Sequence, residues 1–210
     1  MIRVLVVDDH RIFRAGIARL MSDEPDMRVT GEAADGASAL ALLRGHDYDV
    51  VLLDINMGTR NGFETLGSIR AEHARLPVIM LSMYAESHYA RLAIKSRANA
   101  YLSKDVGTDE LLRAVRQVAG GGVYVPLGIG FNAPAPGPVS TGAPPHESLS
   151  PREMQVMLKI AQGISLTDIG TQLCLSVKTI GSHRTRILEK LAISSNAELV
   201  QYAMRHGLVD

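Results

Sequence analysis

The sequence predicts an α/β fold, a five-stranded doubly wound parallel sheet, followed by a small all-α domain. Short apolar runs alternate with helix-like segments up to about residue 120, a proline- and glycine-rich stretch then interrupts this pattern, and four short helical patterns follow. Strands that alternate with helices are typical of a parallel sheet covered on both faces. The closing helical patterns indicate a compact bundle.

The strands are expected where the apolar runs are short and lack the helical period, at 3–7, 28–33, 50–54, 78–82 and 100–103. The helices are expected at 12–22, 36–44, 62–72, 85–95 and 108–119. In such sheets, ligands bind beyond the carboxyl ends of the strands. The polar residues at these ends are Asp8, Asp9, Asp54, Ser82 and Lys104.

Two domains, 1–122 and 148–210, are expected on either side of a flexible linker at 123–147. Residues 126–145 hold six of the nine prolines and four glycines, and no charged residue. A segment of this composition buries too little apolar surface to fold alone. The two domains can therefore change partners without unfolding.

Composition restricts the class of protein. Lys plus Arg and Asp plus Glu number 22 each, so the net charge indicates no nucleic-acid partner and any DNA-binding face must be local. The single cysteine, Cys174, excludes an internal disulfide framework, and we expect it to be a small buried apolar residue. Since no uncharged apolar stretch approaches membrane-spanning length, a cytoplasmic protein without a membrane partner is expected.

Asp54 ends a run of apolar residues, where an unpaired buried charge would cost several kcal/mol. Asp8, Asp9 and Asp54 would bring three negative charges into one pocket. Carboxylates this close together repel one another unless a cation lies among them. Oxygen ligands of this kind indicate Mg2+. Lys104 would add a positive charge and Ser82 a hydroxyl donor, so the set suits phosphoryl transfer to Asp54.

The stretch 175–191, LSVKTIGSHRTRILEKL, predicts the second helix of a helix-turn-helix, after the short helix LTDIGTQL and the tight turn CLS. Its buried stripe is expected to hold Ile180, His183, Ile187, Leu188 and Leu191. Its opposite face carries Lys178, Ser182, Thr185, Arg186 and Glu189. Such a face can enter a major groove. An ordinary bundle helix with a solvated charged face is the alternative.

Four serines mark the expected helix starts in this region, at 150, 165, 176 and 195. Three belong to S-x-x-[DE] capping boxes, SPRE, SLTD and SNAE. Ser176 is followed by Thr179, which replaces the acid only in part.

The motifs VVDDH, LLDINM, IMLS and AYLSKD resemble the receiver domain of two-component response regulators, over roughly residues 1–122. Residues 149–208 are similar to the LuxR-type helix-turn-helix, including its KT…H…I…KL core. The two together are typical of the NarL/FixJ subfamily. The resemblance implies a flavodoxin/CheY-like sheet and phosphorylation of Asp54 by a sensor histidine kinase or a small phosphodonor.

The resemblance also implies roles for single residues. Asp8, Asp9, Asp54 and the backbone carbonyl of Asn56 would hold Mg2+. Lys104 would pair with the phosphoryl group, Ser82 would move to hydrogen-bond it, and the ring of Tyr101 would then turn inward. In the helix-turn-helix, Gly181, Ser182 and Thr185 match base-facing positions, and the further DNA-binding candidates are Lys178, Thr179, Arg184 and Arg186.

The sequence departs from the family pattern at three positions. Gly58 stands where a proline is common, which removes a φ constraint from the loop. Arg97 stands where a helix usually ends in glycine, and a non-glycine residue in the left-handed region costs about 1 kcal/mol or more. Gly181 replaces a common lysine and weakens its helix by about 1 kcal/mol.

The expected function is a phosphorylation-controlled transcriptional regulator, in which phosphate on Asp54 promotes a homodimer and binding to promoter DNA. One alternative is a constitutive DNA-binding regulator whose receiver serves only for dimerisation. Another is a phosphohydrolase, which would need an acid two residues after its nucleophile. Asn56 and His10 stand there instead, after Asp54 and Asp8 respectively, so no enzyme is expected. His10 is expected to be partly exposed at the start of the first helix rather than a metal ligand.

Overall fold

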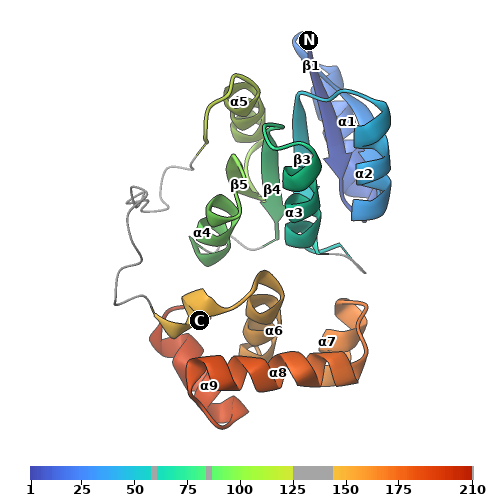
Figure 1. Cartoon of the computed structure of the whole chain (residues 1–210). Helices are drawn as coiled ribbons and strands as arrows, with labels where there is room; N and C mark the ends of the chain where they lie inside the picture. The colour runs from blue at the N-terminus through green and yellow to red at the C-terminus, as the bar shows by residue number, and fades with distance from the viewer. Residues whose placement is uncertain (58–60, 84–86, 125–143, 210) are drawn as a thin grey trace. The chain divides into compact units, whose positions relative to one another are not determined.

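The computed structural model describes residues 1–57, 61–83, 87–124 and 144–209 (Figure 1). The chain divides into two compact units, Met1–Gly130 and Phe131–Asp210. Most of the predicted linker, 123–147, lies outside the described residues, as does Gly58. Within the described ranges, no helix is long and apolar enough to cross a membrane.

The N-terminal unit is a five-stranded parallel sheet in the order β2-β1-β3-β4-β5, which confirms the predicted fold class. Its strands are β1 Ile2–Val7, β2 Met27–Ala33, β3 Val50–Asp54, β4 Val78–Ser82 and β5 Ala100–Ser103. Its helices are α1 Arg11–Ser22, α2 Gly36–Gly45, α3 Gly62–Glu72, α4 Ser87–Lys95 and α5 Thr108–Ala119.

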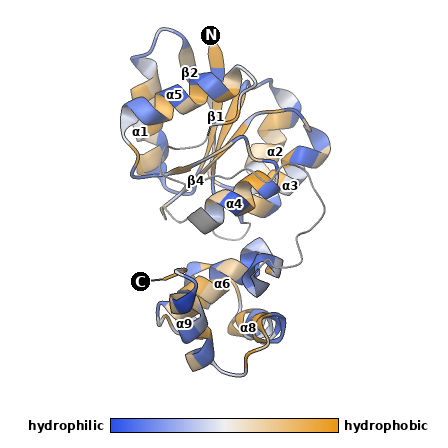
Figure 2. Cartoon of the chain, turned by 90° about the vertical axis from the view of Figure 1, so that its left-hand side faces the viewer, coloured by the Kyte–Doolittle hydropathy of each residue, from blue (hydrophilic) through white to orange (hydrophobic). Residues whose placement is uncertain are grey.

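Helices cover both faces of this sheet, α1 and α5 on one side and α2, α3 and α4 on the other (Figure 2). Every residue of β3 and β4 is buried, because a central parallel strand has covered neighbours on both faces. The chain runs from β1 to β2 on one side and then to β3 on the other side of β1. The carboxyl ends of β1 and β3 therefore border the crevice where such sheets bind ligands.

The end of α4 keeps the usual helix-ending geometry although it has no glycine. Arg97 has φ of 65°, and its N–H donates to the carbonyl of Ile94 at 2.9 Å while the N–H of Ala98 donates to that of Ala93 at 2.8 Å. Arg70 of α3 donates from Nε to the Arg97 carbonyl at 2.9 Å. This additional hydrogen bond helps to hold a backbone conformation that arginine adopts at a cost.

The C-terminal unit begins with a 3-10 helix, η1, and contains four α-helices. Their bounds are η1 Pro145–Ser148, α6 Pro151–Ala161, α7 Leu166–Gln172, α8 Val177–Leu191 and α9 Asn196–Arg205. The predicted helix starts are confirmed, since each of the four serines is an N-cap whose side chain accepts a backbone N–H three residues on.

Part of the predicted linker is folded onto this unit. His146 of η1 is buried, and its Nδ1 lies 2.9 Å from the hydroxyl of Tyr202 in α9. Lys190 of α8 donates to the carbonyl of Ser148 at 3.4 Å. Residues 145–147 therefore pack with the helical unit, three residues before its predicted start.

Candidate functional site

Four strand ends meet at one edge of the sheet and bring polar side chains together. Asp8 directly follows β1, Asp54 ends β3, Ser82 ends β4 and Lys104 directly follows β5. Asp8, Asp54 and Ser82 have no exposed surface, and 4% of the Lys104 side chain is exposed. Parallel strands produce this convergence because all their carboxyl ends lie at the same edge.

Lys104 bridges two buried carboxylates. Its Nζ lies 2.6 Å from Oδ2 of Asp8 and 3.1 Å from Oδ2 of Asp54, and 4.7 Å above the ring of Phe13. Burial raises the pKa of Asp54 to about 6, against the effect of Lys104, and the charge of Asp8 adds to the rise. Two carboxylates share one ammonium, so the edge remains negative and can accept a further cation.

The exposed side of this edge carries Asp9 and His10, with 38% and 66% of their side chains exposed. His10 is partly exposed at the N-cap of α1, as predicted, yet it points to the acids. Its Nδ1 lies 2.8 Å from Oδ1 of Asp9 and 3.1 Å from Oδ1 of Asp8. Asp8, Asp9, His10 and Asp54 each offer one ligand atom within 4.8 Å of all the others.

This donor set fits Mg2+. Carboxylate oxygens are the ligands that hard cations prefer, and Mg2+ keeps several waters, which need a side open to solvent. Asp8 and Asp54 supply buried oxygens and Asp9 an exposed one. Asn56, whose carbonyl completes the predicted set, lies two residues beyond Asp54, and both carboxylate oxygens of Asp54 are buried without a hydrogen-bond partner among the described residues.

Tyr101, the predicted switch residue, lies in β5 with 1% of its surface exposed. Its ring is therefore inside the protein rather than on its surface. β5 pairs with β4 beside it, Tyr101 opposite Met80 and Ser103 opposite Ser82. Tyr101 and Ser82 thus belong to neighbouring strands at the site's edge.

Two supporting residues at this edge were missed from the sequence. Arg14 of α1 donates from Nη1 to the carbonyl of Asp8 at 2.7 Å, which holds the acidic turn. Gly62 begins α3, and a Cβ at this position would overlap the carbonyl oxygen of Asp54. Glycine in the pair Asn61-Gly62 after the strand was an available signal of close approach, whereas nothing in the sequence marks Arg14.

In the C-terminal unit, the predicted buried stripe of α8 is confirmed for Ile180, Ile187, Leu188 and Leu191; His183 is half-buried. The opposite face is exposed, as predicted, at Lys178, Ser182, Thr185, Arg186 and Glu189. Arg184 donates from Nε to Oδ1 of Asn196 at 2.6 Å. Its guanidinium is thus engaged with α9.

The two hydroxyls on the exposed face bond back to their own helix. Ser182 donates to the carbonyl of Lys178 at 3.1 Å, and Thr185 donates to that of Gly181 at 3.2 Å. Thr179, near the helix start, lies with its Oγ1 2.8 Å from Oγ of Ser176. The side chains of this face therefore have defined orientations.

The turn between α7 and α8 departs from the prediction at one residue. Cys174 is exposed, with φ of 51°, so the expectation that it is a buried apolar residue is wrong. The turn forces its backbone into the left-handed region and its side chain outward. Gly170 of α7 makes the turn possible, because a Cβ there would lie 2.8 Å from the carbonyl oxygen of Leu175.

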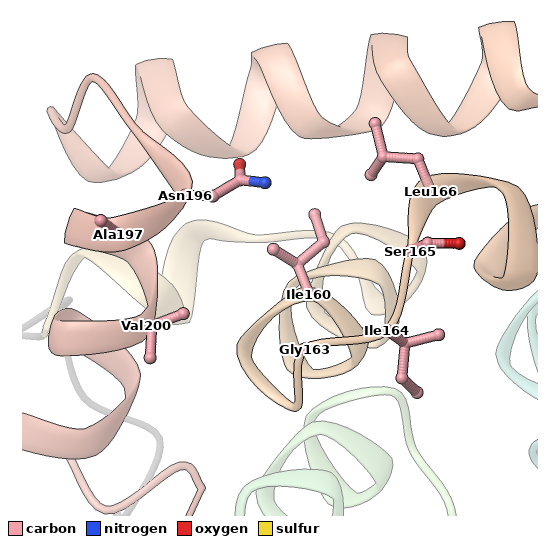
Figure 3. Close-up of a pocket in the computed structure, with 8 residues that line it drawn as sticks. All are labelled: Ile160, Gly163, Ile164, Ser165, Leu166, Asn196, Ala197 and Val200. Carbon is pink, nitrogen blue, oxygen red and sulfur yellow. The ribbon is translucent and has the colours of Figure 1, made fainter.

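A hollow of about 350 Å³ lies between the end of α6, the following turn and α9 (Figure 3). Ile164, Leu166 and Val200 give it apolar walls, and none of its eight lining residues is charged. Its polar lining side chains are those of Ser165 and Asn196, so it offers no charged group to bind an ion or to transfer a proton.

A parallel sheet with carboxylates and a lysine at its strand ends, in one chain with a helix-turn-helix unit, defines the response-regulator class of protein. The family profile of the response regulator receiver domain matches residues 4–116, and that of the bacterial regulatory proteins of the luxR family matches residues 147–203. The chain belongs to the response regulators of the NarL/FixJ type, and is accordingly a DNA-binding transcription regulator.

Relatives match along the whole chain. Response regulator UvrY of Escherichia coli K12 is 38% identical over 210 residues, which cover 99% of this chain and 96% of that protein. Response regulator GacA of Pseudomonas aeruginosa is 36% identical over 212 residues, with 100% and 99% covered. RcsB of Salmonella enterica, solved on promoter rprA with a phosphomimetic, shares the fold, with a TM-score of 0.63 at 22% identity over 96% of this chain and 98% of that one.

Gly181 gives a direct test of the α8 surface. No atom outside the helix lies within 4 Å of a Cβ built there, so Gly181→Ala is expected to stabilise the C-terminal unit by about 1 kcal/mol through helix propensity alone. Gly170→Ala, which would clash with Leu175, is expected to lower stability. Urea unfolding followed by circular dichroism measures both, and equal effects of the two variants would contradict this account.

Proposed function

We propose that this regulator is switched by phosphorylation of Asp54. The observation that carries the proposal is the buried Asp54 carboxylate at a strand end, 3.1 Å from Lys104 Nζ and beside a second buried carboxylate. A carboxylate in this setting can attack a phosphoryl group, while the protein positions the reactants and neutralises charge. The proposed phosphodonors are a cognate sensor histidine kinase and small acyl phosphates.

Each residue at the edge has a proposed task. Asp8, Asp9, Asp54 and the carbonyl of Asn56 would hold Mg2+, which would neutralise negative charge during the transfer. Lys104 leaves the carboxylate of Asp54 and pairs with the new phosphoryl group. The hydroxyl of Ser82 donates a hydrogen bond to it. Both side chains start within the same buried edge, so short movements are enough.

We propose that phosphorylation changes the surface of the receiver, and that this change transmits the signal. Movement of Ser82 alters the β4 and β5 side of the receiver, where the Tyr101 ring already lies inside the protein, and the altered surface favours a homodimer. Two linked helix-turn-helix units then bind two half-sites with a higher effective concentration than one unit has. We propose that residues 1–122 form the receiver, residues 123–147 the linker and residues 148–210 the DNA-binding domain, with the last three linker residues packed against the DNA-binding domain.

The DNA-binding face is proposed on α8. Its exposed residues Lys178 and Arg186 are assigned to phosphates, and Ser182, Thr185 and Gly181 to base edges. Thr179 and Arg184 complete the face, Arg184 after release from Asn196. Support comes from the luxR-family match over residues 147–203 and from the exposure of four of these side chains, those of Lys178, Ser182, Thr185 and Arg186. The fold neighbour RcsB was itself solved bound to a promoter.

The test is intact-mass and size-exclusion analysis of the full chain after incubation with acetyl phosphate and Mg2+, beside Asp54→Asn. One added phosphate on the wild type alone, with a shift from monomer to dimer, is the expected result. Promoter binding should then tighten only for the phosphorylated wild type.

The alternative is a constitutive DNA-binding regulator whose receiver only dimerises. It predicts the same oligomeric state and the same DNA affinity for the wild type and Asp54→Asn, with and without the phosphodonor. Phosphorylation of both the wild type and Asp54→Asn would instead show that a residue other than Asp54 accepts the phosphoryl group. Asp8→Asn would then be examined in the same way.

A further inference from the structure

His10 occupies a position that the proposed mechanism does not use. Its imidazole Nδ1 lies between two carboxylate oxygens, 2.8 Å from Oδ1 of Asp9 and 3.1 Å from Oδ1 of Asp8. The backbone N–H of His10 also donates to Oδ1 of Asp8 at 2.8 Å. The backbone and the ring of His10 are thus both fixed relative to the carboxylate that is buried in the site.

The Nδ1 of His10 lies at hydrogen-bond distance from both carboxylate oxygens. Once Nδ1 has released any proton that it carries to solvent, the same separations match those of neighbouring ligands around one ion. In octahedral coordination with bonds of about 2.1 Å, two adjacent ligand atoms lie about 3 Å apart. The Nδ1 of His10 stands at this spacing from two of the proposed oxygen ligands. All four candidate donors, including Asp54, also lie within 4.8 Å of one another. Opposite ligands of such an ion are about 4.2 Å apart, so the donors come together around one ion after a small inward movement.

We propose that His10 supplies an imidazole nitrogen to the cation held by Asp8, Asp9 and Asp54. This inference rests on the proposed use of the acidic edge for a cation and concerns which cation it selects. A purely oxygen site suits Mg2+, whereas a site with one imidazole favours divalent transition ions. The site then prefers Mn2+, and still more Ni2+ and Zn2+, to Mg2+.

The surroundings of His10 fit this role. The ring is largely exposed, so its Nε2 reaches water while Nδ1 faces the acids. It stands at the N-cap of α1 without a side-chain capping bond, so coordination takes no hydrogen bond from the helix. With five protein ligands, counting the Asn56 carbonyl, one position of an octahedral ion stays open to a water or to a phosphoryl oxygen.

The test uses the full-length, metal-stripped protein loaded with one equivalent of Mn2+. Electron spin-echo envelope modulation reports a directly coordinated nitrogen through its coupling to the Mn2+ electrons. The wild type should show this nitrogen modulation, and His10→Gln should lose it. His46→Gln, a change of an exposed histidine at the end of α2, is the matched control and should keep it.

Calorimetric titrations give the selectivity. In His10→Gln the affinity for Ni2+ should fall by roughly tenfold or more. A loss of this size is typical even when the mutated residue only hydrogen-bonds to a metal ligand. The affinity for Mg2+ should stay within about twofold, since the carboxylates remain. An equal loss for both ions would mean that His10 only positions the acids, and would overturn the proposal.

The two proposals can fail separately. Phosphorylation of the wild type with Mg2+ and no nitrogen modulation with Mn2+ would refute the role of His10 and leave the switch intact. Nitrogen modulation without phosphorylation would establish the ligand and refute the switch.

Discussion

Replacing Lys104 by methionine is expected to lower the unfolding free energy of the N-terminal unit by about 3–5 kcal/mol, the usual result of removing one partner from a buried ion pair. Asp8 and Asp54 are fully buried, and Lys104 is the cation that the described structure pairs with both of them. Without it, the two buried carboxylates lose the ammonium group that lies between them. Native-state hydrogen exchange of the β3 amides at pH 8 measures the loss.

Mg2+ is expected to restore part of this stability, because it takes over the neutralising role and binds only the folded state. Lys95→Met is the matched control, since Lys95 is exposed in the last turn of α4, and its effect should stay within about 0.5 kcal/mol. A Lys104→Met variant as stable as this control would show that the buried pair contributes nothing.

Gly62→Ala is the second change with a large expected effect. The added methyl would overlap the carbonyl oxygen of Asp54, and the atoms in its way belong to the backbone and cannot rotate aside. Overpacking of this kind costs about 1–3 kcal/mol. The start of α3 or the end of β3 must shift, so the rate of phosphorylation by acetyl phosphate should also fall.

The control lies in the same helix. A Cβ at Gly67 meets nothing within 4 Å, so Gly67→Ala should stabilise the unit by up to about 1 kcal/mol and leave the phosphorylation rate unchanged. Thermal unfolding and the kinetics of mass increase distinguish the two variants. Equal rates in both would show that the backbone at Asp54 tolerates the displacement.

Most of the N-terminal fold could be predicted from the sequence because local signals were consistent there. Apolar runs predicted β3 and β4, which are buried on both faces. Both ends of α1, α2, α3 and α5 lie within one residue of the expected bounds, whereas the expected start of α4, at residue 85, lies outside the described residues. The convergence of Asp8, Asp54 and Lys104 followed from the rule that parallel strands end at one edge. Their roles in phosphoryl transfer stay predictions until the experiments above are done.

Other features depend on contacts that no local pattern encodes. Arg14 reaches the carbonyl of Asp8 only because α1 folds back over β1. Cys174 was predicted from the average behaviour of cysteine, but the turn of the helix-turn-helix decides its exposure. The side-chain orientation of His10, and with it the choice of cation, likewise required the three-dimensional positions of two carboxylates.

The back-bonded hydroxyls of α8 affect what the proposed DNA face can read. A hydroxyl has one hydrogen and two lone pairs, and Ser182 and Thr185 each commit the hydrogen to a carbonyl of their own helix. Toward the outside, these two hydroxyls can therefore only accept hydrogen bonds. In the major groove, acceptors pair with the exocyclic amino groups of adenine and cytosine and not with the O6 and N7 of guanine. At these two positions the helix would favour bases that offer a hydrogen-bond donor. This preference follows from hydrogen bonds within the helix, which form before any DNA is bound.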